Sequence, residues 1–365
     1  MVDLPNGGFY GRIDGENNVH PNAKKGVILN TRILWTFSIA ARHFEKPEYL
    51  KMANRAYDYL KLYFWDEQDG GVFWEVDEQG NPTETKKQIY AQGFAIYALS
   101  EYHLLTGNRE SLQLAQEIFW LVEKYSLDPN HGGYLEAFSR GWELLEDLRL
   151  SDKDANEAKT MNTHLHVLEA YTNLYRVLPT DKLANRLVEL VDLFQEKFID
   201  PKTGHLRLFF DEEWNLKSHE ISFGHDIEAS WLLWECREVL GEKYPNPDQL
   251  KRTILKMAEA TLTEGVDPKG GTWNEATLDG ISDADKIWWV QAESMVGFLN
   301  AYQLTGDKKF LSATLDIWKF VEKNLKDRKN GEWYWAVDQE CVPQIKHNKA
   351  GPWKAPYHHV RALLE

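Results

Sequence analysis

Apolar residues recur at helical spacing through most of the chain, and the helical segments come in pairs. In three pairs a glycine (Gly107, Gly241 or Gly306) separates the two segments, and glycine there is typical of a helix end. The pattern therefore predicts five helix pairs and one final helix. We expect the pairs at 27–43 and 48–64, 87–105 and 109–124, 159–177 and 181–198, 224–240 and 247–264, and 286–304 and 308–324, and the final helix from Pro356 to Glu365.

A turn motif precedes each pair and the final helix. It combines Asp, Pro or Asn with one or two glycines, and aromatic and β-branched residues follow it, which is typical of a short β-hairpin. Equivalent glycines of successive turns are 60 to 71 residues apart, which indicates six copies of one supersecondary unit. These glycines are Gly8, Gly71, Gly133, Gly204, Gly271 and Gly331.

Two all-α architectures fit six such units. One is an open α-solenoid, and the other is a closed (α/α)6 barrel of six inner and six outer helices with short β-hairpins at one mouth. Polar side chains on the first helix of each unit favour the barrel. Eleven helices are predicted in place of twelve, so we expect the first outer helix, ahead of residue 4, to be absent. No Ser/Gly/Pro-rich linker interrupts the pattern, so one domain over 1–365 is expected, with 141–159 as a functional loop.

Polar and aromatic residues gather near the start of the first helix in each unit. A single helical His, Arg or Trp is more often structural than functional. Their recurrence at equivalent places in successive units predicts instead that they converge on the centre of a barrel. The residues are Arg32; Tyr90; Asn162, His166 and Glu169; His225 and Glu228; Trp288, Trp289 and Glu293; and Trp353, His358 and Arg361.

This set of side chains favours proton transfer. The chain lacks zinc-type ligand spacing, a Gly-rich phosphate loop and a Gly-x-Ser-x-Gly elbow. His225 and His358 fall in the first turn of their helices, where the helix dipole keeps imidazole neutral, and two bases on opposite faces of a carbon suit inversion of a C–H centre. Glu228 is expected to orient a histidine ring. Arg32 offers a cation for an oxyanion.

The composition limits the classes of partner and the cellular location that we expect. The net charge of −15 disfavours nucleic acid. No apolar run reaches about 20 residues and no signal peptide is evident, so no membrane association is expected. With only Cys236 and Cys341, we expect no disulfide framework and a cytoplasmic location. The 15 Trp, 16 Tyr and 16 Phe suit sugar binding as well as a core. We expect a monomer.

Three motifs identify a family resemblance. Gly224-His-Asp-Ile-Glu-Ala-Ser-Trp-Leu-Leu, Met161-Asn-Thr-His-Leu-His-Val-Leu-Glu-Ala and Gly351-Pro-Trp-Lys-Ala-Pro-Tyr-His resemble the cellobiose 2-epimerases of the N-acylglucosamine 2-epimerase superfamily. The resemblance runs from about residue 4 to the C-terminus. It implies an (α/α)6-barrel isomerase that converts the reducing-end glucose of β-1,4-linked disaccharides, such as cellobiose and lactose, to mannose. Ring opening, a cis-enediolate and reprotonation at C2 are implied, with no metal, nucleotide or other cofactor.

The same resemblance implies roles for particular residues. His225 and His358 match the acid/base pair, and His166, rather than His164, matches the histidine of ring opening. Arg32 matches the arginine that binds the enediolate oxygens, and Glu228 matches the partner of the catalytic histidine. The implied sugar-binding residues are Tyr90, Asn162, Glu275, Trp289 and Trp353, with Asp154 expected to reach the second sugar.

The sequence departs from the family pattern in places. Members normally have a helix before the first hairpin and a longer final helix, and they often have Cys where Ala355 stands. The two missing helical segments agree with the count of eleven predicted helices. Alanine at position 355 is expected to pack without touching the chemistry.

Other functions stay open at this point. Within the superfamily, the same bases would serve a mannose-type aldose–ketose isomerase or an N-acylglucosamine 2-epimerase. An inverting glycoside hydrolase needs two carboxylates about 6.5–9.5 Å apart, for which Glu228 and Glu275 are the candidates, but it leaves three histidines unexplained. A helical-repeat carbohydrate-binding protein would have a groove without converging His and Arg side chains.

Overall fold

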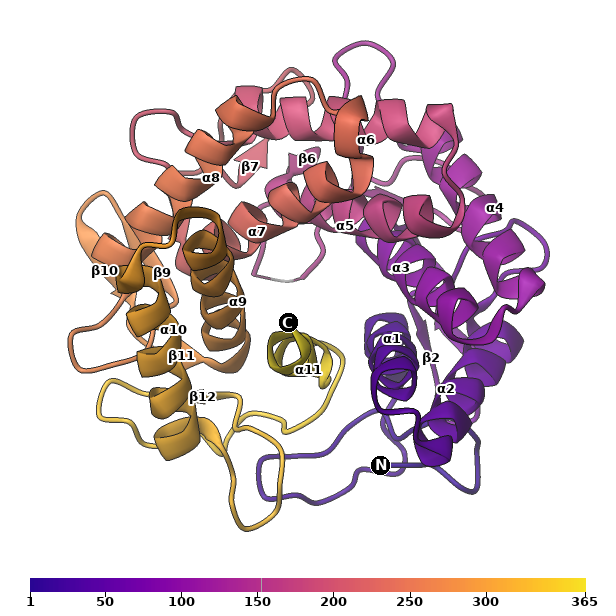
Figure 1. Ribbon diagram of the computed structural model, residues 1–365. Coiled ribbons are helices and arrows are strands. Elements are labelled where there is room, and N and C mark those ends of the chain that lie inside the picture. Colours follow the sequence, from indigo (N-terminus) through magenta and orange to yellow (C-terminus); the bar gives the residue numbers. More distant parts are fainter. Residues whose placement is uncertain (152) are drawn as a thin grey trace.

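The computed structural model describes residues 1–151 and 153–365. Eleven α-helices in these residues form two concentric rings (Figure 1). The inner ring contains α1 (Val27–Phe44), α3 (Ile89–Thr106), α5 (Met161–Val177), α7 (Phe223–Leu240), α9 (Trp288–Thr305) and α11 (Tyr357–Leu364). The outer ring contains α2 (Pro47–Tyr59), α4 (Arg109–Tyr125), α6 (Asp181–Leu193), α8 (Pro247–Ala260) and α10 (Lys308–Phe320).

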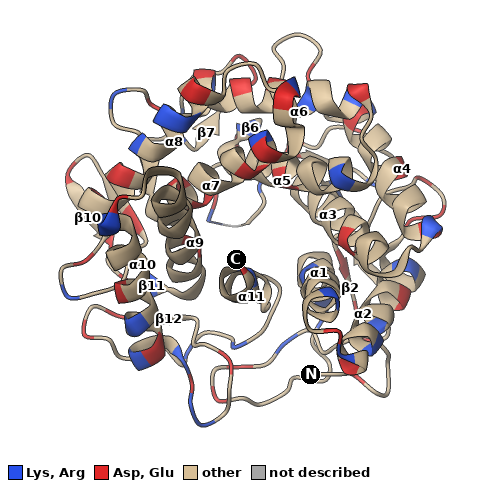
Figure 2. Cartoon of the chain, in the orientation of Figure 1, with Lys and Arg blue, Asp and Glu red and all other residues tan. Residues whose placement is uncertain are grey.

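The inner ring closes on itself. Each inner helix packs against the next one along the chain, and α11 packs against both α9 and α1. The fold is therefore the expected (α/α)6 barrel and not an open solenoid. Inner helices such as α3 are buried on almost every side. Outer helices such as α4 bury one stripe, Ala115, Ile118, Phe119 and Val122, at the helical period. Charged residues accordingly gather on the outer helices and loops (Figure 2).

The predicted helix bounds agree with the structure to within two residues, if the single π-helical turns that end four outer helices are included. Three inner helices begin two residues later than predicted, because residues 87–88, 159–160 and 286–287 form strands. Nowhere in 1–151 or 153–365 is a helix long and apolar enough to cross a membrane. The short helical turns are η1 (Leu60–Phe64), η2 (Phe194–Phe198), η3 (Gly241–Lys243, a 3-10 turn), η4 (Thr261–Gly265) and η5 (Val321–Leu325).

The strands link neighbouring units and do not only close the predicted hairpins. Within a unit, a single antiparallel bridge spans the turn, as between Trp65 and Val72. The strand before an inner helix pairs with a strand of the next unit, in the pairs β1–β2, β4–β5, β6–β7, β8–β9 and β11–β12. These ladders hold the N-terminal ends of the inner helices at one mouth. The strands are β1 (Lys25–Gly26), β2 (Glu75–Val76), β3 (Pro82–Glu84), β4 (Lys87–Gln88), β5 (Ala137–Phe138), β6 (Lys159–Thr160), β7 (Phe209–Phe210), β8 (Ile221–Ser222), β9 (Glu275–Thr277), β10 (Gly280–Asp283), β11 (Lys286–Ile287) and β12 (Ala336–Val337).

Buried lysine–aspartate pairs fasten the turns to the inner helices. Lys87 Nζ lies 2.9 Å from a carboxylate oxygen of Asp66, and both side chains are fully buried. Equivalent pairs occur in four other units. Removing one partner of such a pair would leave the other charge buried without a counter-charge. The fourth unit has Ile221 at the lysine position and uses a different contact, between His205 and Asp226 at 2.7 Å. The other pairs are Lys25–Asp3, Lys159–Asp128, Lys286–Asp267 and Lys349–Asp327.

Candidate active site

A cavity of about 420 Å³ opens at the mouth where the inner helices begin. Its walls come from α1, α3, α5, α7 and α9, from α11, and from the long loop between β5 and β6. This size lies in the range of small-molecule sites. The lining residues are Arg32, Tyr90, Leu150, Ser151, Lys153, Asp154, Asn162, His166, His225, Glu228, Trp288, Trp289, Trp335, Trp353 and His358.

The cavity brings together every predicted site residue except Glu275. That residue begins β9, where side chains alternate between the two faces of the strand: Ala276 is buried and Glu275 is exposed. Glu275 is not among the described residues that line the cavity, although Lys153 of the cavity wall is close enough for its charge to act on the Glu275 carboxyl group. The expected functional loop supplies Leu150, Ser151, Lys153 and Asp154 to the wall.

Trp289 packs against both histidines that were expected to exchange protons. Its ring centroid lies 4.8 Å from that of His225 and 5.6 Å from that of His358. Gly224 makes this approach possible, since a Cβ atom there would lie 2.5 Å from the Trp289 indole. An aromatic wall next to two imidazoles suits a sugar ring, whose C–H face packs on the indole while its hydroxyls meet polar groups.

His358 is held by Glu293. The Nδ1 atom of His358 lies 2.6 Å from Glu293 Oε1 and 3.9 Å from Glu228 Oε1, so Glu293 and not Glu228 is its direct partner. A carboxylate acceptor places the proton on Nδ1 and leaves Nε2 as a base. Burial, followed by the charge of Arg32, lowers the pKa of His358 well below its usual value.

His225 has a different partner. Its Nδ1 atom lies 2.7 Å from the hydroxyl oxygen of Ser222, at the end of β8. A hydroxyl group can donate or accept, so His225 can present either a protonated or a free Nε2. Burial lowers its pKa to about 3. Burial is thus the main cause of the expected neutral state, and the positive end of the α7 dipole acts in the same direction.

His166 and Glu169 form the expected pair on one face of α5. The His166 Nδ1 atom lies 2.8 Å from Glu169 Oε2. Burial lowers the pKa of His166, and Glu169 opposes the shift. His164, by contrast, accepts a hydrogen bond from the Tyr134 backbone N–H at 2.8 Å, which fixes the third turn. His166 lines the cavity, whereas His164 has a structural contact.

Arg32 brings a positive charge to the cavity. Its guanidinium donates to the Trp353 carbonyl oxygen at 2.8 Å and to the Tyr90 hydroxyl at 2.9 Å, and it lies over the rings of Phe94 and Tyr357. No carboxylate in the described part of the chain forms an ion pair with it, and its buried Nε atom has no protein partner. A buried cation without a counter-charge stabilises negative charge that develops on a ligand.

A second arginine, Arg361, lies among three carboxyl groups. It contacts Glu169, and its Nη2 atom lies 2.8 Å from Glu228 and 2.7 Å from Glu293. Burial alone would raise the pKa of Glu169, but Arg361 and His166 outweigh it and bring the pKa to about 2. Burial and the charge of Glu293 raise the pKa of Glu228 well above its usual value. Burial also raises the pKa of Glu293, which Arg361 opposes, so Glu228 and Glu293 share one guanidinium and Glu228 is the weaker acid of the two.

Three groups of this cluster also have the spacing of metal ligands. Ligand atoms of Glu228, Glu293 and His358 all lie within 4.8 Å of one another. Arg361 already lies against both carboxyl groups, and His358 Nδ1 already contacts Glu293. A metal ion would have to displace the guanidinium and break that contact. The hydrogen bonds therefore favour proton transfer at this place over metal binding.

Several site residues had no role assigned from the sequence. Glu293 and Arg361 were placed on inner helices, and their spacing offered a signal, because Glu293 follows Trp289 by four residues and Arg361 follows His358 by three. No sequence signal pointed to Ser222, because its contact with His225 depends on how strand β8 pairs with its neighbour. Three lining residues have a buried polar atom without a protein partner, which a polar ligand would complement. These atoms are Arg32 Nε, Asn162 Oδ1 and Trp288 Nε1.

Comparison with known proteins places the chain in a family. A cellobiose 2-epimerase of Bacteroides fragilis is 48% identical over 366 residues, which cover 100% of this chain and 93% of that protein. The solved structure of cellobiose 2-epimerase from Bacillus thermoamylovorans B4167 superposes with a TM-score of 0.96 at 42% identity, over 100% of this chain and 93% of that one. A D-mannose isomerase of Marinomonas mediterranea is 24% identical, over 99% of this chain and 91% of that protein. The sequence profile of the N-acylglucosamine 2-epimerase (GlcNAc 2-epimerase) family matches residues 8–362, and the chain therefore belongs to this family.

Proposed function

We propose that the protein epimerises the reducing-end glucose of β-1,4-linked disaccharides at C2, converting cellobiose to glucosyl-mannose and lactose to epilactose without a cofactor. The site observation that carries the proposal is the pairing of two neutral histidines, His225 and His358, in one cavity with Arg32. Relatives with up to 48% identity over the whole chain bear the name cellobiose 2-epimerase, which supports the same reaction here.

The contacts support a role for each base. His166, held by Glu169, assists opening of the sugar ring. His358 Nε2 then takes the proton from C2, and the electron pair of that C–H bond moves toward C1 as the carbonyl oxygen becomes an oxyanion. Arg32 stabilises the resulting cis-enediolate. His225 takes up a proton from solvent and delivers it to the opposite face of C2, the carbonyl group reforms in the manno epimer, and His358 releases its proton to solvent.

Substrate binding follows from the walls of the cavity. The indoles of Trp289 and Trp353 face the sugar rings, and Tyr90 and Asn162 bind hydroxyl groups of the reducing sugar. Asp154 lies in the mouth loop, where its carboxylate accepts two hydrogen bonds from Ser151, and it is suited to contact the second sugar. We further propose that the protein works as a monomer in the cytoplasm.

Inverting hydrolysis fits the site poorly. That reaction needs two carboxyl groups about 6.5–9.5 Å apart, with room for a water between them. Of the two candidates, Glu228 contacts Arg361 and Glu275 is exposed on β9. Aldose–ketose isomerisation uses the same bases and differs only in returning the proton to C1, so it is distinguished by its product.

The test is incubation with cellobiose in D2O containing EDTA, followed by NMR of the sugars. We expect a mannose-type reducing end with deuterium at C2. Free glucose would indicate a hydrolase, a ketose alone would indicate an isomerase, and unchanged cellobiose would refute the proposal. His225→Ala and His358→Ala should each abolish turnover while sugar binding, measured by calorimetry, persists. Wild-type turnover in either variant would refute the assigned roles.

A further inference from the structure

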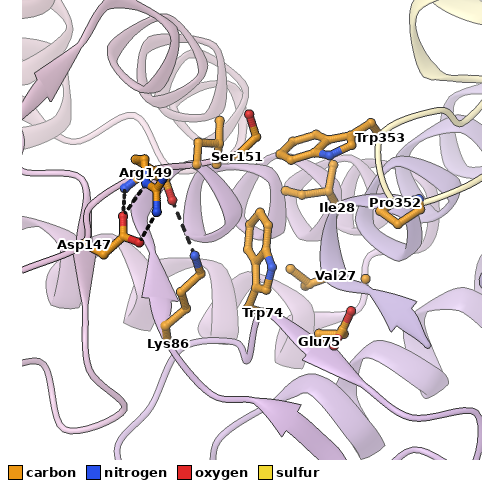
Figure 3. A pocket seen from close by; sticks show the side chains of 12 residues that line it. Val27, Ile28, Trp74, Glu75, Lys86, Asp147, Arg149, Ser151, Pro352 and Trp353 are labelled. Atoms are coloured by element: carbon orange, nitrogen blue, oxygen red, sulfur yellow. Dashed lines mark hydrogen bonds and ion pairs between the residues drawn. The ribbon is translucent and has the colours of Figure 1, made fainter. Parts of the chain in front are cut away.

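A second cavity, of about 290 Å³, adjoins the candidate active site. The two cavities share Leu150, Ser151 and Trp353 as a common wall. Figure 3 shows this second cavity, with Trp353 above and Trp74 beside it. A ligand that extends from the active site past Trp353 therefore meets a second, partly open cavity.

The second cavity has an aromatic corner. The ring centroids of Trp74 and Trp353 are 5.9 Å apart, and the two planes are tilted by 58°. The Trp74 backbone is fixed on both sides, because its carbonyl oxygen accepts from Val27 N–H at 3.0 Å and its N–H donates to the Glu84 carbonyl at 3.1 Å. The backbone holds Trp74 in place, and its indole, which contacts Trp353, offers a surface for the apolar face of a ring-shaped ligand.

The rim of the cavity is polar but electrically balanced. The rim contains two acids and two bases: Asp147 lies beside Arg149 and Lys86, whereas Glu75 lies on the other side of Trp74 and pairs with Lys24 at 2.7 Å. Arg149 lies 2.7 Å from Asp147, and Lys86 lies over the Trp74 ring at 5.1 Å. An anionic ligand would meet both signs of charge. Hydroxyl groups, which donate and accept, match such a rim, so the chemistry favours a neutral carbohydrate.

We propose that this cavity binds the third sugar of a β-1,4-linked oligosaccharide whose reducing end occupies the active site, with Trp74 as its main contact. This inference rests on the proposed function, which places the reducing end of the ligand at the histidines. The first sugar lies among the histidines, the second lies at Trp353, and the third lies beyond it against Trp74. The protein is therefore built to bind cellotriose more tightly than cellobiose.

The test compares dissociation constants of cellobiose and cellotriose by calorimetry in a His358→Asn background, where no sugar is consumed. We expect cellotriose to bind about fivefold more tightly, equivalent to about 1 kcal/mol. Trp74→Ala should remove this ratio and Trp74→Phe should retain most of it. Trp120→Ala, which removes a half-exposed indole from outer helix α4, is the matched control and should leave the ratio unchanged.

Equal affinities for both sugars in the background protein would overturn the proposal. So would an equal weakening of both sugars by Trp74→Ala, which would mean that Trp74 only supports Trp353. The ratio of kcat/KM for the two sugars, measured with and without Trp74→Ala in the otherwise unchanged protein, gives a second readout should His358→Asn fail to fold. Because calorimetry needs no turnover, a protein that fails to epimerise cellobiose can still confirm or refute this sugar site.

Discussion

Replacing Glu293 with glutamine tests the hydrogen bond that holds His358. Glu293 Oε1 accepts from His358 at 2.6 Å and from Arg361 at 2.7 Å, and Oε2 accepts from the Trp231 indole at 3.0 Å. Glutamine keeps the shape, but it has one acceptor oxygen and no charge. Its NH2 group must face either the Trp231 N–H or the two donors at Oε1. At least one hydrogen bond is lost in either orientation.

The magnitude follows from the kind of hydrogen bond. A hydrogen bond to a charged group contributes about 1.5–3 kcal/mol, and a loss of that size in the transition state lowers kcat about 10- to 150-fold. We expect kcat to fall by this factor with little change in KM, because His358 acts on the proton and does not bind the sugar. Initial rates of deuterium incorporation at C2 of cellobiose, measured by NMR, give both constants. A kcat within twofold of wild type would refute the role of Glu293.

Glu228→Gln is the matched control. Glu228 is 3.9 Å from the same histidine atom and contacts the same arginine, but its pKa is raised well above the usual value, in part by the charge of Glu293, so it holds a proton more readily than Glu293 does. A glutamine there preserves both shape and charge, so kcat should fall less than about tenfold. If Glu228→Gln lowered kcat more than Glu293→Gln, the charges assigned to the two carboxyl groups would be reversed.

Three further predictions concern charge. Arg32→Met should lower kcat about 10²- to 10³-fold, as loss of an oxyanion donor does, while calorimetry still detects cellobiose; an unchanged kcat would contradict the role. Lys159→Met leaves Asp128 buried without its counter-charge and should lower the free energy of unfolding in urea by about 3 kcal/mol. The double variant with Asp128→Asn should recover most of this loss, because asparagine carries no charge and keeps an acceptor for the backbone N–H groups of Asn130 and His131. Burial alone would lower the pKa of His205, but Asp226 and Glu264 outweigh it and raise the pKa to about 9 from 6.5. The stabilisation by His205 is complete below pH 6.5 and is lost as pH rises through 9, so the difference in melting temperature from His205→Gln should disappear by pH 10. A difference that persisted there would contradict this assignment.

The fold was predictable because local signals repeat. Each unit has the same turn residues and two helical segments, so the helix bounds could be read from the sequence to within two residues. The pairing of the strands could not be predicted, because a strand of two residues is too short to show an alternation of polar and apolar positions, and its partner lies in another unit. Lys25 pairs with Val76, for example, and nothing near either residue indicates the other.

The site was predictable where a residue sits on an inner helix near its start. Equivalent positions on such helices converge at one mouth, which is why His166, His225 and His358 meet in one cavity. Contacts between different helices could not be predicted from the sequence. Glu293 and His358 are 65 positions apart, so their hydrogen bond depends on how α9 and α11 rotate against each other. Glu275 lies on a strand and not on a helix. Side chains alternate between the two faces of a strand, so a shift of one residue changes the face on which a carboxyl group lies.

Burial explains why bases and acids can coexist at the barrel centre. It disfavours every charge, so it keeps the three cavity histidines neutral and at the same time raises the pKa of nearby carboxyl groups. Arg361 contacts all three carboxyl groups and opposes this effect of burial, and together with His166 it lowers the pKa of Glu169 to about 2, whereas the pKa values of Glu228 and Glu293 stay raised. Glu169 and Glu293, which hold His166 and His358, both contact this arginine. A single guanidinium thus holds the two carboxyl groups that orient His166 and His358, and it also contacts Glu228, the carboxyl group that lines the cavity.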